Sequence, residues 1–150
     1  MLANDLAKNP ARSEEPRRQD GVIVGDLLAR TEAESYVLIG HRLGARVMVV
    51  AAETLGTKPE GLRIQSAHLL AAAIGAKSNW DSLTAAVDDV THGYHSSAAA
   101  VLKYVYRTAQ AGEIAAGYEG FAPVSSKLQN IDVTEVVKTH FDDQEHVQLV

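Results

Sequence analysis

The chain contains no cysteine, few aromatic residues and no long apolar run. The lack of cysteine excludes disulfides, iron–sulfur clusters and thiolate zinc sites, and it fits a cytoplasmic protein. Aromatic residues make up 5% of the 150 residues, so the core must be built from Ala, Val and Leu, which favours helix-on-helix packing. No apolar run approaches the ~20 residues that span a bilayer, and the N-terminus lacks a secretory signal. We therefore expect a cytoplasmic protein without membrane contact.

Clusters of basic residues are also lacking. The 14 Lys and Arg residues against 19 Asp and Glu give a formal net charge of −5. Nonspecific binding to nucleic acid depends on grouped Lys and Arg that neutralise phosphates, so we do not expect nucleic acid as a partner. The hydrophobic fraction of 46% and the length indicate one packed domain.

The N-terminal segment has the composition of a tail. Residues 1–20 are polar, interrupted by Pro10 and Pro16, and carry charges of both signs. Such a segment buries too little apolar surface to offset the entropy of ordering it. We predict a disordered tail over residues 1–20 and a single helical domain over residues 21–150.

Apolar periodicity and glycine stops predict helices through the rest of the chain. We expect them from Asp26 to Ile39, from Leu62 to Ile74, after Ser78, over residues 96–111 and from Asp132 onward. Ser78 with Asp81, and Asp132 with Glu135, have the spacing of capping boxes. The predicted fold is an all-α bundle of five or six helices with a disordered N-terminal tail.

The stretch Arg46–Ala52 has two interpretations. It is apolar on every side, so it is either a buried helix that runs on to Leu55 or a buried strand. Its β-branched residues favour a strand, while its length and its flanking Ala and Glu favour a helix. We interpret it as a helix because no convincing partner strand is apparent. The alternative is an α+β fold with a short strand at 46–52.

Two carboxylate–histidine pairs suggest a metal site. Asp89 with His92, and Asp143 with His146, are three residues apart, a spacing that places both side chains on one side of a helix. Ferritin-like di-metal bundles use Glu and His at this spacing. Here Asp replaces Glu, and the helical periodicity turns both pairs away from the apolar faces, so we favour solvent-facing positions. The metal alternative would use Asp89, His92, His95, His140, Asp143 and His146.

Sequence motifs for a nucleophile or a phosphate-binding loop are absent. The chain has no G-x-S-x-G, no G-x-x-x-x-G-K-[ST] and no G-x-G-x-x-G after a strand. Gly40 and Gly44 are four residues apart, which we interpret as a close helix crossing or a kink. Four tyrosines gather late in the chain and suggest an interaction surface, although plain packing explains them equally well. They are Tyr94, Tyr104, Tyr106 and Tyr118.

Residues Ser66 to Leu83 combine a leucine- and alanine-rich stretch, Gly75 and Trp80. This segment resembles a helix–Gly–Trp–helix segment of bacterial glyoxalase-related and plasmid-borne accessory proteins. The resemblance implies a bacterial origin and a hairpin in which a helix ends at Gly75 and Trp80 covers Leu70 and Ile74. It implies no catalytic residue.

Two functional hypotheses follow. The first is a non-enzymatic helical interaction protein, an adaptor or accessory subunit that forms homo-oligomers and needs no cofactor. It rests on the Ala- and Val-rich helical core and on the lack of any convergent polar constellation. The alternative is a helical metal-binding enzyme of the ferritin-like di-metal carboxylate type, using the histidines and carboxylates named above.

Overall fold

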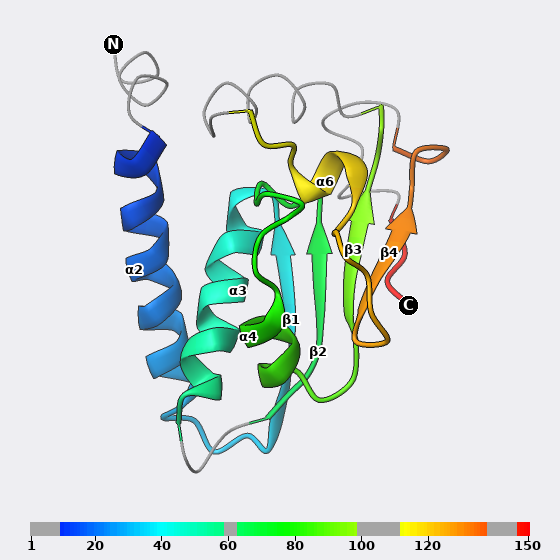
Figure 1. Ribbon diagram of the computed structural model, residues 1–150. Helices are drawn as coiled ribbons and strands as arrows, with labels where there is room; N and C mark the ends of the chain where they lie inside the picture. Colours follow the sequence, from blue (N-terminus) through cyan, green and yellow to red (C-terminus); the bar gives the residue numbers. More distant parts are fainter. Residues whose placement is uncertain (1–9, 59–62, 99–111, 138–146) are drawn as a thin grey trace.

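The chain folds as one parallel β-sheet with helices packed against it (Figure 1). The computed structural model describes residues 10–58, 63–98, 112–137 and 147–150. The strands are β1 (Ser35–His41), β2 (Arg63–Leu70), β3 (Thr91–His95) and β4 (Leu128–Asp132). The helices are α2 (Pro10–Leu28), α3 (Leu43–Gly56), α4 (Asp81–Ala86) and α6 (Ala116–Glu119). The fold class is therefore α/β, and the predicted all-α bundle is wrong.

The strand order in space equals the order along the chain, β1-β2-β3-β4, and each neighbouring pair is parallel. Crossovers between parallel strands are right-handed almost without exception. Successive crossovers in one direction therefore place their helices on the same face, and Figure 1 shows α3 and α4 on one side of the sheet. The same topology brings the carboxyl ends of all four strands to one edge, at the top of Figure 1, which we call the carboxyl edge.

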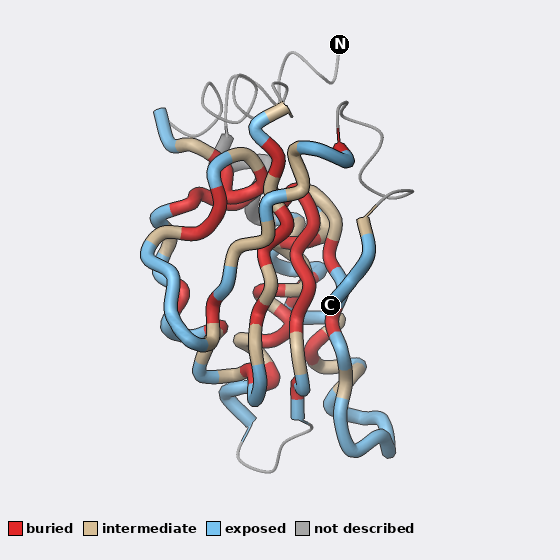
Figure 2. Tube along the Cα trace, turned by 90° about the vertical axis from the view of Figure 1, so that its right-hand side faces the viewer, coloured by how far each residue is buried: buried red, intermediate tan, exposed pale blue. Residues whose placement is uncertain are grey.

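The core lies between the sheet and this helical layer. Leu38 of β1 and Leu69 of β2 belong to the same buried cluster as Ala52 of α3. Trp80 and Phe121 also belong to it, with ring centroids 4.6 Å apart in a T-shaped arrangement. Figure 2 shows the buried positions along the middle of the molecule and the exposed ones at its turns.

Helix α2 begins at Pro10, inside the segment that we predicted to be a disordered tail. The helix lies beside α3 (Figure 1), and its two glycines face that neighbour. A Cβ on Gly21 would lie 2.5 Å from Cβ of Val50, and one on Gly25 would lie 2.8 Å from Cβ of Thr54. The absence of side chains at these two positions allows the two helices to approach closely. This packing stabilises α2 as a helix although its polar composition predicts a disordered tail.

The two segments predicted as helices on either side of α3 are strands. Residues 35–41 and 63–70 form β1 and β2, whereas α3 confirms the helical interpretation of residues 46–52 and excludes a strand there. Ala67 to Leu70 are all buried. Strands that are covered on both faces have continuous apolar sequences without alternation, so the sequence of β2 does not distinguish a buried strand from a buried helix.

The two predicted capping boxes are turns of another kind. The N-cap of α4 is Trp80, and the amide of Asp81 donates a hydrogen bond to Oδ1 of Asn79 at 2.9 Å. Asp132 ends β4, and its Oδ1 accepts from the amide of Thr134 at 2.9 Å in an Asx-type turn. From residue 99 on, the predicted helix over 96–111 lies outside the described residues. Among the described helices, none is long and apolar enough to cross a membrane.

Candidate functional site

Ligands of open parallel sheets bind at the carboxyl ends of the strands, so the carboxyl edge is the first place to look for a site. At this edge β1 ends at His41, and α3 begins at Leu43, with Arg42 as the single residue between them. Arg42 has φ 53° and ψ −115°, a left-handed conformation that L-residues rarely adopt. We call residues Gly40–Gly44 the elbow.

Backbone hydrogen bonds fix the elbow to the end of β2. The amide of Arg42 donates to the carbonyl of Leu70 at 2.9 Å, and the carbonyl of Arg42 accepts from the amide of Ala73 at 3.2 Å. A Cβ on Gly40 would lie 2.5 Å from Cα of Ala45, so the sharp turn requires glycine there. A Cβ on Gly44 would meet nothing within 4 Å. Within the elbow, the backbone strain therefore lies at Arg42, and the close approach to the backbone of Ala45 lies at Gly40.

This strand–turn–helix is the geometry on which α/β-hydrolases carry the serine of G-x-S-x-G. In those enzymes the nucleophile sits on a strained turn between a strand and a helix and is exposed at the top of the sheet. Here the sequence is Gly40-His41-Arg42-Leu43-Gly44, with arginine at the position of the serine. The interpretation of these glycines as a helix kink or crossing is wrong. The missed signal was the apolar run Tyr36–Ile39 before Gly40, whose aromatic and β-branched residues mark a strand leading into the turn.

A second polar group lies on the sheet face opposite α3. Side chains alternate between the faces of a strand, and the register places His68 of β2 beside His92 of β3 on that face. The two imidazoles stack with centroids 5.2 Å apart, and Nδ1 of His68 lies 3.0 Å from the Tyr94 hydroxyl. The Tyr94 hydroxyl also accepts from the amide of Val150 at 3.1 Å. We call His68, His92 and Tyr94 the histidine stack.

Burial keeps both imidazoles of the histidine stack neutral. Burial lowers the pKa of His68 below its ordinary value of 6.5, and the neighbouring His92 lowers this pKa further. Burial also lowers the pKa of His92. The side chain of His68 is 4% exposed, and Nδ1 of His92 is buried without a hydrogen-bond partner among the described residues. Sequence reasoning did not identify His68 as a candidate site residue. The one feature that could have indicated it is the position of a histidine inside an apolar run.

Hydroxyl and carboxylate groups follow β3 and β4 at the carboxyl edge. Ser96 is buried and donates its hydroxyl to the carbonyl of Val137 at 2.9 Å. Hydrogen bonds from Thr134 lower the pKa of Asp132, and the charge of His95 lowers it further. Within the described part of the chain, the Ser96 hydroxyl therefore has a structural role, and no histidine or carboxylate accepts its proton.

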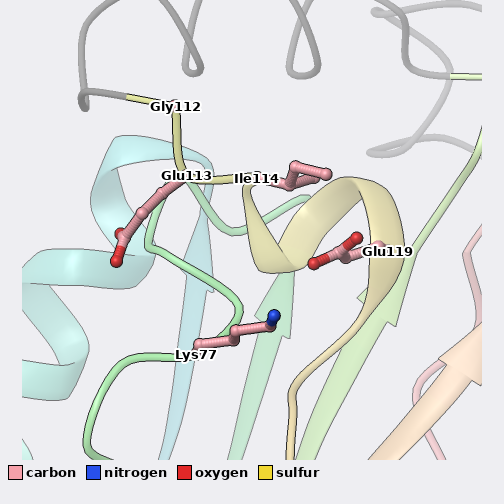
Figure 3. A pocket seen from close by; sticks show the side chains of 5 residues that line it. All are labelled: Lys77, Gly112, Glu113, Ile114 and Glu119. Atoms are coloured by element: carbon pink, nitrogen blue, oxygen red, sulfur yellow. The ribbon is translucent and has the colours of Figure 1, made fainter.

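A pocket of about 400 Å³ opens beside α6 (Figure 3). Its charged lining residues are Lys77, Glu113 and Glu119. Figure 3 shows the Lys77 side chain directed toward the side that carries Glu119, while Glu113 points away from both. The pocket is small and charged, and its described lining residues include no serine, threonine or histidine.

The predicted metal ligands do not converge in the described residues. Asp89 precedes β3 and His92 lies within it, so the two share no helical face, and His92 and His95 point to opposite faces of the strand. Among the described residues, no group of three or more His, Asp or Glu side chains could hold a metal ion. His140, Asp143 and His146 lie outside the described residues.

The predicted tyrosine surface is not a single patch in the described part of the chain. Tyr94 is 2% exposed and belongs to the histidine stack, so it is a core residue. Tyr118 is half-buried on α6 and packs against Ala71, Ala73 and Ala115. Tyr104 and Tyr106 lie outside the described residues.

Comparison with known proteins gives one match. No curated protein and no solved structure matches the chain. The predicted resemblance to glyoxalase-related and plasmid-borne accessory proteins is not found, and residues 66–83 contain strand β2 instead of a helix that ends at Gly75. Residues 12–150 match the family described as "Protein of unknown function (DUF726)". Because this match covers most of its length, the chain belongs to the DUF726 family.

Proposed function

We propose that the protein is a non-enzymatic interaction domain built on a hydrolase-like elbow. The observation that carries this proposal is Arg42, which occupies the strained residue between β1 and α3. The backbone geometry of a nucleophile-bearing turn is present, and the nucleophile is replaced.

Arginine cannot perform the chemistry of the residue that it replaces. A hydrolase serine attacks an acyl carbon after a neighbouring base removes its proton. The guanidinium of arginine is positively charged, and it offers hydrogen-bond donors but no acceptor. Acyl transfer through Arg42 is therefore excluded, and the hydroxyl of Ser96, which follows β3 at the carboxyl edge, is bonded to a backbone carbonyl.

Exposed apolar side chains support an interaction role. Ile23 and Leu27 of α2 are 55% and 59% exposed, and Val37 and Ile39 of β1 are 48% and 54% exposed. Exposed apolar residues that recur along one element are typical of contact surfaces. No observation favours the metal-binding alternative, because the described ligand candidates do not converge.

Turnover of activated esters tests the proposal. Wild-type protein and the Arg42→Ala variant are assayed with p-nitrophenyl esters of increasing chain length. We expect the hydrolysis rate of both proteins to equal that of heat-denatured protein at the same concentration. Turnover by the wild type that falls at least about tenfold in Arg42→Ala would show that Arg42 takes part in a reaction, and the proposal would be wrong.

A further inference from the structure

Strand β1 forms one edge of the sheet. Within the described residues β2 is the strand that pairs with it, so the backbone amides and carbonyls on the other side of β1 face outward. Natural proteins usually protect such an edge with charged residues or proline, because an open edge pairs readily with another strand. The sequence of β1, Ser-Tyr-Val-Leu-Ile-Gly-His, contains neither proline nor any Asp, Glu, Lys or Arg.

The exposed face of this edge strand is apolar as well. Val37 and Ile39 lie on the face opposite α3 and are 48% and 54% exposed. Leu38, between them, is buried under α3 in the core cluster. An additional strand along β1 would bond the outward backbone groups and cover these two side chains at the same time.

We propose that the occupant of this edge is β1 of a second copy of the chain, paired antiparallel about a twofold axis at Leu38. In this register Leu38 lies opposite Leu38 of the second copy, and Val37 lies opposite Ile39 of the second copy. Directly opposite residues share a face of the sheet. Both exposed apolar side chains of each copy are therefore covered by the matching pair, as an isologous twofold contact requires. The result is one continuous sheet across two copies.

The charges at the two ends of β1 favour this antiparallel pairing. Glu32 and Glu34 precede the strand, are exposed and outweigh the single exposed Arg30 before them, whereas the half-buried Arg42 and Arg46 follow the strand. Antiparallel pairing brings the acidic end of each copy toward the basic end of the other, and parallel pairing of two copies would bring like ends together. Complementary charge at both ends of a contact favours the matching orientation over the opposite one.

The interface is small, so we expect weak association. Pairing along seven residues of β1 falls at the low end of specific contacts, below about 1,200 Å² of buried surface. A dissociation constant on the order of micromolar is typical of such contacts, so the measurement must extend to a few hundred micromolar. The proposal rests on the interaction role argued above. The two proposals can nevertheless be tested separately. A monomeric protein would disprove the dimer but would not affect the expected absence of ester hydrolysis.

Sedimentation equilibrium of the full chain tests the dimer. We expect the wild type to form dimers, the Ile39→Lys variant to raise the dissociation constant at least about tenfold, and Val124→Lys to leave it unchanged. Val124 is the matched control because it is exposed to a similar extent, in the segment that leads into β4 at the opposite edge of the sheet. Circular dichroism and urea unfolding confirm that both variants are folded. A wild type that stays monomeric, or equal effects of the two lysines, would overturn the proposal.

Disulfide trapping tests the register. The chain contains no cysteine, so only the introduced thiols can form disulfides between two copies. A mixture of Val37→Cys and Ile39→Cys proteins should cross-link faster than either variant alone, because directly opposite Cβ atoms lie about 5 Å apart and diagonal ones about 7–8 Å. Equal rates for the mixture and the single variants would contradict the register centred on Leu38.

Discussion

Arg42 and Gly40 together define the elbow at the scale of single residues. Arg42 holds φ 53° because its amide is bonded to the last residue of β2, Leu70, and its carbonyl to Ala73 just after that strand. Gly40 is required because the backbone of Ala45 lies where its side chain would be. Left-handed, non-glycine residues of this kind cost about 1–3 kcal/mol each and tend to occur at functional sites.

The two glycines of the elbow should respond differently to alanine. We expect Gly40→Ala to lower the free energy of unfolding by about 1–3 kcal/mol, because its Cβ would clash with Cα of Ala45. Gly44→Ala is the matched control: it lies in α3 with open space around it, so alanine should be neutral or stabilise by up to about 1 kcal/mol. Urea unfolding of the three proteins measures both effects. Equal losses in the two variants would contradict the geometry of the elbow.

The histidine stack should make stability depend on pH. The pKa of His68 and that of His92 are both lower in the folded protein than the ordinary 6.5. At pH values between the folded-state pKa and 6.5, the unfolded chain therefore binds more protons than the folded protein. The free energy of unfolding should therefore be constant above neutral pH and should fall as the pH drops below 6.5. Most carboxylates titrate at lower pH, so urea unfolding at about pH 7.5 and about pH 5.5 reports mainly on the histidines. Burial raises the pKa of Glu53, whose protonation therefore opposes the effect of the histidines.

The His92→Gln variant is the control for this pH dependence. It removes one of the two stacked imidazoles at a partly exposed position, so the stability lost between the two pH values should be smaller than in the wild type. A wild type whose stability is unchanged or rises on acidification would contradict the burial of neutral imidazoles.

Sequence reasoning at this scale found the elbow residues but not their meaning. The sequence shows Gly40 and Gly44 four residues apart and contains no G-x-S-x-G motif. A motif defined by its nucleophile cannot reveal a turn in which the nucleophile is replaced, because the left-handed φ of Arg42 is set by tertiary hydrogen bonds. The same holds for His68, which meets His92 through strand register alone.

At the scale of elements, α2 depends on its close packing against α3. Gly21 and Gly25 are four residues apart on one helical face and lie against α3. Outside this contact, Asp26 of α2 pairs with Lys58 at 2.8 Å and Leu28 packs against the core cluster, whereas Pro16 interrupts the hydrogen bonding of the helix. Its helical state therefore rests on tertiary packing more than on propensity.

Replacement of Gly21 by valine tests this contact. A side chain there would collide with Val50 and with the carbonyl of Val47, so we expect Gly21→Val to destabilise the protein by about 2 kcal/mol. Val22→Ala, one position along and facing outward, should change stability by less than about 0.5 kcal/mol. Urea unfolding measures both variants. A neutral Gly21→Val would mean that α2 does not pack closely on α3.

Among the elements, α3 could be predicted and the strands could not. The run from Arg46 to Ala52 is long enough for a helix, and the structure confirms it. The last four residues of strand β2, Ala67–Leu70, are all buried, so this part lacks the alternation that identifies a half-buried strand.

At the scale of the whole molecule, four parallel strands in sequential order leave the two sheet faces unequal. Helices α3 and α4 cover one face, and the other carries the histidine stack and the exposed residues of β1. The elbow lies at the carboxyl edge, where parallel sheets bind ligands. The topology therefore explains both the position of the elbow and the open edge proposed to join two copies.

This arrangement was beyond reach of sequence reasoning for a physical reason. Parallel pairing joins residues that are far apart in the chain, and no local pattern records which strands become neighbours. Composition correctly indicated a packed core, but a core of Ala, Val and Leu suits a parallel sheet covered by helices as well as it suits a bundle.

The central claim is that the elbow carries no nucleophile, and a fluorophosphonate probe tests it most directly. Such probes form a covalent bond with activated serines, and intact mass spectrometry detects the addition. We expect the folded wild-type protein to show no more labelling than the same protein after heat denaturation. Stoichiometric labelling of one serine in the folded state, lost on denaturation, would contradict the account by showing an active nucleophile.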